Sequence, residues 1–133
     1  MTSKNGFLYN KEMDVWIKNP FVISSQSFNY IDWGIFTKIF NDLAAMQSEI
    51  NEKSVKALIS YAHSIDFFTN DEFDDLEFLL LSIELEIKKS VISSFVVNYR
   101  VTEDENTKIP WKDVYGIWEV HFRDFEIVET KRL

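Results

Sequence analysis

The chain has 133 residues, 46% of them hydrophobic and 16% aromatic, with no cysteine and a formal net charge of −8. This length predicts a single domain over residues 1–133 with ample side chains for a core, and the lack of cysteine excludes disulfides and thiol chemistry. The acidic balance argues against nucleic acid as a partner, because phosphate binding needs a basic surface.

The N-terminal part of the chain is predicted to form short strands. It contains no apolar stretch of the kind that a signal peptide or a membrane span requires, which predicts a cytoplasmic protein without membrane contact. Residues 6–9 and 13–18 are predicted to form a hairpin across the polar residues 10–12. Residues 21–24, which follow Pro20, are predicted to form a third short strand.

Two apolar stripes with helical spacing follow in the centre of the chain. The first stripe consists of Ile35, Phe36, Ile39, Phe40 and Leu43. The second stripe consists of Val55, Leu58, Ile59, Ala62 and Ile65. This spacing predicts two amphipathic helices. Because the polar residues 47–51 predict a short connection, we expect the two helices to pack antiparallel.

The C-terminal half is predicted to be mostly strand. Residues 71–78, after Thr69 as a candidate N-cap, predict a short third helix. The apolar period then changes to two, which is typical of half-buried strands. Four strands are predicted, over residues 83–87, 95–101, 114–123 and 125–130. The predicted fold class is therefore α+β, with an N-terminal hairpin, an antiparallel helix pair and a C-terminal four-stranded antiparallel meander covered by helices.

The net charge is concentrated in one stretch of the chain. Residues 66–87 carry eight acids and no base, whereas the rest of the chain carries 14 acids and 14 bases. Acids at a helix N-terminus are stabilised by the helix dipole, so a solvated surface is one interpretation. A docking surface for a basic protein is the other, since such a field accelerates association by about 10- to 10³-fold. The concentration of the entire charge excess favours the docking surface.

The predicted partner-binding residues are acids around this stretch and one aromatic anchor. They are Asp71, Glu72, Asp74, Asp75, Glu77, Glu103, Asp104, Glu105 and Trp111. The second group of acids and the tryptophan fall in the predicted loop over residues 102–113, where they would widen the surface. Aromatic side chains next to charges are common anchors of protein interfaces.

The sequence contains little that predicts catalysis. His63 lies beside the second helical stripe, and His121 shares a predicted strand face with Glu119. No nucleophile motif or Gly-rich loop accompanies them, and the acids of residues 70–75 lack the spacing of a calcium loop. The sequence therefore predicts no enzyme, no cofactor and no metal site. The alternative left open is a small-ligand-binding or hydrolytic domain with a cleft between helices and sheet, with His121 and Glu119 on its wall.

The order of the predicted elements resembles a group of small bacterial proteins of unknown function. The residues that carry the resemblance are Gly6-Phe7-Leu8, the two helical stripes, Glu72-Phe73 and the ending 113–122, DVYGIWEVHF. Some such acidic proteins are similar to immunity proteins of bacterial toxin systems, which neutralise basic nuclease toxins in the cytoplasm. The resemblance implies an immunity protein that covers the active site of a basic toxin with its acidic surface.

Overall fold

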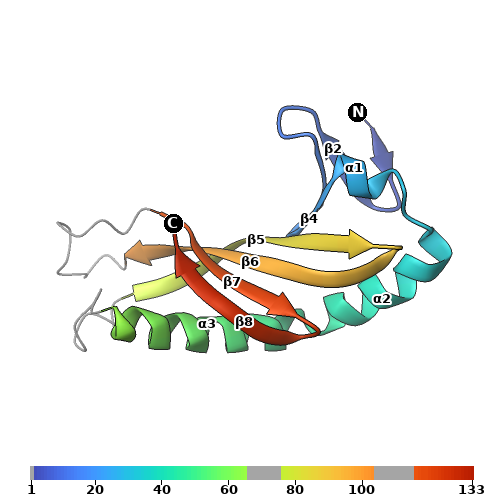
Figure 1. Cartoon of the computed structure of the whole chain (residues 1–133). Coiled ribbons are helices and arrows are strands. Elements are labelled where there is room, and N and C mark those ends of the chain that lie inside the picture. The colour runs from blue at the N-terminus through green and yellow to red at the C-terminus, as the bar shows by residue number, and fades with distance from the viewer. Residues whose placement is uncertain (1, 66–75, 104–115) are drawn as a thin grey trace.

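The computed structural model describes residues 2–65, 76–103 and 116–133. All of the strands in these ranges belong to one eight-stranded sheet, whose strand order follows the chain from β1 to β8 (Figure 1). Neighbouring strands run antiparallel except β4 and β5, which pair in parallel. The predicted fold class is therefore wrong, because the N-terminal hairpin and the C-terminal strands are parts of one continuous mixed sheet.

Four short strands open the chain. They are β1 (Ser3–Lys4), β2 (Phe7–Asn10), β3 (Val15–Lys18) and β4 (Phe21–Ser24). In the turn between β2 and β3, the side-chain oxygen of Asn10 accepts a hydrogen bond from the backbone N–H of Met13 at 3.0 Å. The Tyr9 hydroxyl donates to a carboxylate oxygen of Asp14 at 2.7 Å, which ties the two strands together.

The contact between Tyr9 and Asp14 predicts a pH effect. The hydroxyl of Tyr9, with a further hydrogen bond involving Ser25, lowers the pKa of the Asp14 carboxyl. Such a carboxyl contributes stability that is present above its unfolded-state pKa and is lost as pH falls through its folded-state pKa. We expect Tyr9→Phe to raise the pKa of Asp14 and to lower stability at neutral pH, with this loss shrinking as pH falls through the Asp14 titration.

An NMR titration of Asp14, together with urea unfolding at several pH values, checks this prediction. Tyr30→Phe is the matched control, because the ring of Tyr30 is 84% exposed and should change neither quantity. A Tyr9→Phe variant in which Asp14 titrates as in the wild type would contradict the assignment.

Three helices lie between β4 and β5 in the described part of the chain. They are α1 (Ser25–Phe28), α2 (Trp33–Ala45) and α3 (Gln47–Ser64). Ser24 caps α1 by accepting a hydrogen bond from the N–H of Ser27, and Asp32 caps α2 by accepting one from the N–H of Gly34. In the described ranges, no helix has the length and apolar character needed to cross a membrane.

The two long helices do not form the predicted antiparallel pair. Only Met46 separates α2 from α3, and a helical hairpin needs a loop of about two to five residues to reverse the chain. The helices instead follow one another along the same face of β5–β8 (Figure 1). Residues 47–51, predicted as the turn, are the first residues of α3. A long crossover of this kind allows β5 to pair in parallel with β4.

The C-terminal strands are two hairpins in sequence. They are β5 (Leu76–Lys88), β6 (Val91–Glu103), β7 (Trp118–Arg123) and β8 (Glu126–Arg132). The predicted alternation in β5 and β6 is confirmed, since Ile83, Leu85, Phe95 and Val97 are buried. The helix predicted over 71–78 is wrong at residues 76–78, which are strand, while 71–75 lie outside the described residues.

The boundaries of β7 and β8 also differ from the prediction. The strand predicted over 114–123 begins at Trp118 in the described chain. Gly116 and Ile117 are not part of it, and residues 114–115 lie outside the described residues. Asp124 and Phe125, both with positive φ angles, form the turn to β8, so this strand begins at Glu126 and not at residue 125. Positive φ is tolerated by Asp more readily than by most residues, which favours the turn at this position.

A cluster of aromatic rings joins the N-terminal strands to the helices. Its members are Phe7, Trp16, Phe21, Phe28, Trp33, Phe36 and Phe40. Phe28 lies at its centre, stacked on Trp16 at 4.1 Å between ring centroids and in edge contact with Phe7 at 5.6 Å. Five of the 12 phenylalanines of the chain belong to this cluster. It also fixes β1–β4, which turn away from β5–β8 in Figure 1, against α1 and α2.

Candidate functional site

Most of the predicted partner-binding residues lie outside the described residues: Asp71, Glu72, Asp74, Asp75, Asp104, Glu105 and Trp111. Glu77 lies in β5 with an exposed side chain, and Glu103 is the last residue of β6. Leu76 pairs with Glu103, and Glu77 pairs with Thr102. The chain therefore enters β5 and leaves β6 at the same end of the sheet, so the acidic stretch 66–75 and the segment 104–115 join the sheet at neighbouring residues.

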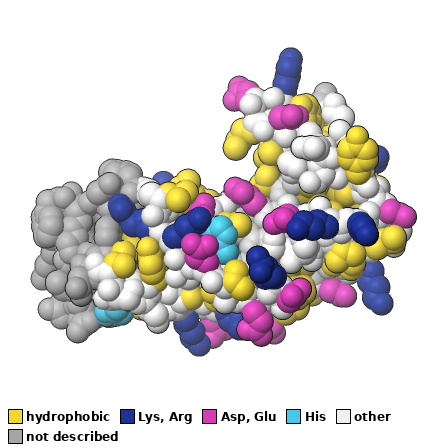
Figure 2. Space-filling model, viewed as in Figure 1, with side chains coloured by type: hydrophobic (Ala, Val, Ile, Leu, Met, Phe, Trp, Pro, Cys, Tyr) yellow, Lys and Arg dark blue, Asp and Glu magenta, His cyan; other side chains and the backbone are white. Residues whose placement is uncertain are grey.

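The described surface carries charges of both signs. Figure 2 shows Lys and Arg side chains interspersed with Asp and Glu over the visible face. Residues 66–75 contain five acids and no base, and residues 104–115 contain three acids and two bases. Most of the net charge of −8 therefore belongs to these two segments, and the remainder of the chain is close to neutral.

A polar cluster lies on the face of the sheet that the helices leave uncovered. His121 Nε2 lies 2.9 Å from Glu119 Oε1, and Lys131 Nζ lies 3.9 Å from the same oxygen. The alternate residues of β7 are buried in the core: Trp118, Val120 and Phe122. Because side chains alternate along a strand, Glu119 and His121 point away from the helices. They do not lie on the wall of a cleft between helices and sheet.

This cluster continues across the sheet through Asn98, which is 5% exposed. Its amide nitrogen donates to Ser82 Oγ at 3.0 Å and to Glu84 Oε1 at 3.1 Å, and Asn98 pairs in register with Glu119. A carboxylate beside an imidazole orients it for proton transfer, but no hydroxyl hydrogen-bonds to His121 among the described residues. Within the same ranges, no three His, Asp or Glu side chains gather to hold a metal ion.

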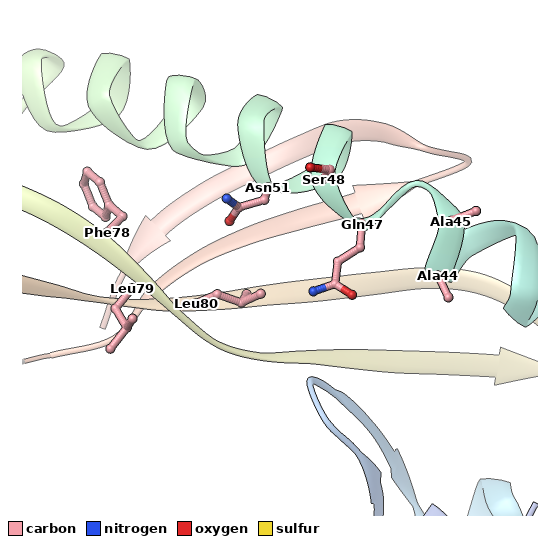
Figure 3. A pocket seen from close by; sticks show the side chains of 8 residues that line it. All are labelled: Ala44, Ala45, Gln47, Ser48, Asn51, Phe78, Leu79 and Leu80. Carbon is pink, nitrogen blue, oxygen red and sulfur yellow. The ribbon is translucent and has the colours of Figure 1, made fainter. Parts of the chain in front are cut away.

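A groove of about 580 Å³ lies between the α2–α3 junction and β5. Its lining residues are Ala44, Ala45, Gln47, Ser48, Asn51, Phe78, Leu79 and Leu80. Figure 3 shows Phe78 pointing toward α3 and Leu79 pointing away from it. The lining contains amide and hydroxyl groups but no charged side chain, and the two alanines leave the space open. The sequence interpretation missed this groove, because it treated residues 47–51 as a turn and residues 76–78 as helix.

Tyr99 fixes one side chain of this groove. Its hydroxyl donates to Asn51 Oδ1 at 2.7 Å, and its ring is fully buried. Burial raises the pKa of Tyr99 to about 12, so the hydroxyl stays protonated and remains a donor at neutral pH. The bond therefore engages the carbonyl oxygen of Asn51 and orients its amide group.

Comparison of the chain with protein-family models, with curated proteins and with solved structures finds no match. The resemblance to immunity proteins of toxin systems therefore stays a prediction. The functional proposal below rests on the residues of this chain alone.

Proposed function

We propose that this chain is a non-enzymatic binding protein whose partner is a basic protein. One observation carries the proposal, namely the pairing of Leu76 with Glu103 at one end of the sheet. Because of this pairing, the two segments that hold most of the net charge, 66–75 and 104–115, join the sheet side by side. In this proposal the acids of both segments add to one negative electrostatic field that attracts the same partner. This favours a docking surface over scattered solvated charges.

The mechanism in this proposal is steric and electrostatic. The acids Asp71, Glu72, Asp74, Asp75 and Glu77 take the place of the phosphates that a nucleic-acid-binding protein normally contacts. Trp111 supplies an aromatic anchor within the same interface. In its most specific form, the proposal is an immunity protein that covers the active site of a basic nuclease toxin in the cytoplasm. Such a role requires tight association and no chemistry from the chain itself.

The experiment that tests the proposal is an affinity pull-down with the tagged full chain from an extract of its host organism. The bound fraction is washed at low salt and then at high salt, and the released proteins are identified by mass spectrometry. We expect a basic protein that is retained at low salt and released at high salt, because salt screens the attraction between exposed charges. An empty low-salt fraction, or retained proteins indifferent to salt, would overturn the proposal.

A further inference from the structure

One edge of β5 has no strand beside it over half of its length in the described chain. β6 pairs with β5 along its whole length, from Leu76 to Lys88. On the opposite edge, β4 pairs with β5 only at Ile83 and Glu84. Among the described residues, no strand pairs with residues 78–82 of β5 on this edge. Such edges are templates to which another chain adds a strand.

The hydrogen bonds of the sheet show which backbone groups face this edge. The N–H of Ile83 donates to the carbonyl oxygen of Pro20 at 2.8 Å, so the backbone groups of Ile83 point toward β4 and those of Ser82 toward β6. The backbone groups of successive residues point alternately toward one neighbouring strand and toward the other. The bulge between Leu80 and Ser82 inserts one extra residue, Leu81, so the alternation shifts by one residue there. The N–H and C=O groups of Phe78 and Leu80 therefore point outward, into the unpaired edge.

Side-chain positions on both sides of this edge suit an added strand. On the helix side lies the groove of about 580 Å³ at the α2–α3 junction, which Phe78 and Leu80 help to line. On the other side, Leu79 is 44% exposed and Leu81 is 40% exposed. Because side chains of a strand alternate, an added strand would place every second side chain in the groove and the others beside Leu79 and Leu81.

The charge of β5 indicates the chemistry of the added strand. β5 carries three acids, Glu77, Glu84 and Glu86, and one base, Lys88, whose Nζ lies 3.6 Å from Glu86 Oε1, so the strand is acidic on balance. We propose, on the basis of the proposed function, that the basic partner binds by adding an extended segment rich in Lys or Arg along the edge of β5 at Phe78 and Leu80. Main-chain hydrogen bonds would hold this segment, and its alternate side chains would contact the groove on one side and Leu79 on the other.

Amide hydrogen exchange of the ¹⁵N-labelled full chain, followed by NMR, tests the free edge first. The amides of Leu79 and Ser82, which face β6, are expected to exchange slowly, and those of Phe78 and Leu80 quickly. Slow exchange at Phe78 and Leu80 in the dilute free chain would overturn the proposal, because the chain's own residues would then cover the edge. Protection that grows with protein concentration would also overturn it, because a second copy would be the occupant.

The second step adds a synthetic peptide of about ten residues that alternates lysine with valine, a length typical of a strand. We expect amide exchange at Phe78 and Leu80 to slow by about tenfold. This factor corresponds to the upper end of the stability that one backbone hydrogen bond usually contributes. A peptide that alternates glutamate with valine should leave both amides unchanged. Equal effects of the two peptides, or no slowing by the lysine peptide, would overturn strand addition.

Two variants distinguish strand addition from general attraction between charges. Leu79→Lys places a positive charge beside the added strand and should weaken lysine-peptide binding about threefold through like-charge repulsion across the strands. Val128→Lys is the matched control, because Val128 is also exposed and lies on β8 at the opposite edge of the sheet. Equal weakening by both variants would overturn the proposal.

The same exchange measurement with the basic partner retained in the pull-down separates the two hypotheses. Salt-sensitive binding that slows amide exchange at Phe78 and Leu80 supports both the proposed function and strand addition. Salt-sensitive binding that leaves these amides unchanged overturns strand addition and leaves the proposed function standing. Failure to retain any basic partner overturns the proposed function, whatever the peptide does.

Discussion

Phe28→Ala is expected to lower the free energy of unfolding by about 3–5 kcal/mol, the range typical of truncating a buried phenylalanine. Phe28 is 2% exposed and contacts Phe7, Trp16 and Trp33 through ring pairs with centroids 5.6, 4.1 and 5.1 Å apart. Removing this ring leaves a cavity where the N-terminal strands meet α1 and α2. Dispersion contacts on all sides of the cavity are then lost together.

Urea unfolding followed by tryptophan fluorescence and by far-ultraviolet circular dichroism measures this effect. Phe125→Ala is the matched control, because Phe125 is 38% exposed and its ring pairs with Phe95 alone among the described residues. We expect the control to lose clearly less stability than Phe28→Ala. Similar losses in both variants, or separate transitions for fluorescence and dichroism in the wild type, would contradict a shared aromatic core.

The second large effect is expected in association with the basic partner. Simultaneous Asp71→Lys, Asp74→Lys and Asp75→Lys should slow association with the retained partner by about tenfold or more and flatten its salt dependence, because the attractive field is reversed. The dissociation rate should change less, since exposed charges steer the encounter more than they hold the complex. Stopped-flow fluorescence measures the association rate constant directly.

The matched control for this variant changes acids elsewhere. Glu12, Asp42 and Glu126 are exposed in the described structure and lie outside the stretch 66–87. Changing all three to Lys alters net charge by the same amount as the triple variant, and we expect a clearly smaller effect on association. The proposal requires the three acids to act from the protein surface, where a charge contributes about 0–1 kcal/mol, so urea unfolding should give similar stabilities for the triple variant and the wild type. Equal slowing by both variants would show that total charge, and not its position, governs the encounter.

Local patterns in the sequence predicted local structure well. The alternation around Ile83 and Val97 marks strands in which one face is buried. The stripes through Phe36 and Leu58 mark the buried sides of α2 and α3, although Ile35 and Ile65, at the ends of these stripes, are exposed. These signals need only the period of a single element. The hairpin between β2 and β3 was also predictable, because polar residues 10–12 separate two runs of strand-forming residues.

Non-local pairing was beyond the sequence patterns. Nothing in residues 21–24 indicates that β4 pairs in parallel with β5, some 60 residues later in the chain. Residues 47–51 are polar enough for a turn, but they form the start of α3. With Met46 as the single residue between the helices, the chain does not reverse its direction there. The run from Leu76 to Leu81 has no clear period, and the acids before it favoured a helix, so the start of β5 was predicted too late.

The candidate site was predictable only in part. The acid-rich composition of residues 66–87 is plain in the sequence, and so are His121 and Glu119 as neighbours on one strand face. The groove beside Phe78 and the unpaired edge of β5 arise from how α2, α3 and β4 meet β5, which no single element determines. The alternative function, a cleft between helices and sheet with His121 and Glu119 on its wall, fails because the helices cover the other face of the sheet.

The association rate constant of the wild-type chain with its isolated partner, measured from low to high ionic strength, tests the central claim most directly. If an acidic end of the sheet recruits a basic protein, the rate constant falls steeply as salt rises and converges on the rate of the triple Lys variant. A rate constant that stays constant across the salt series would contradict the claim, because the acids would then play no part in the encounter.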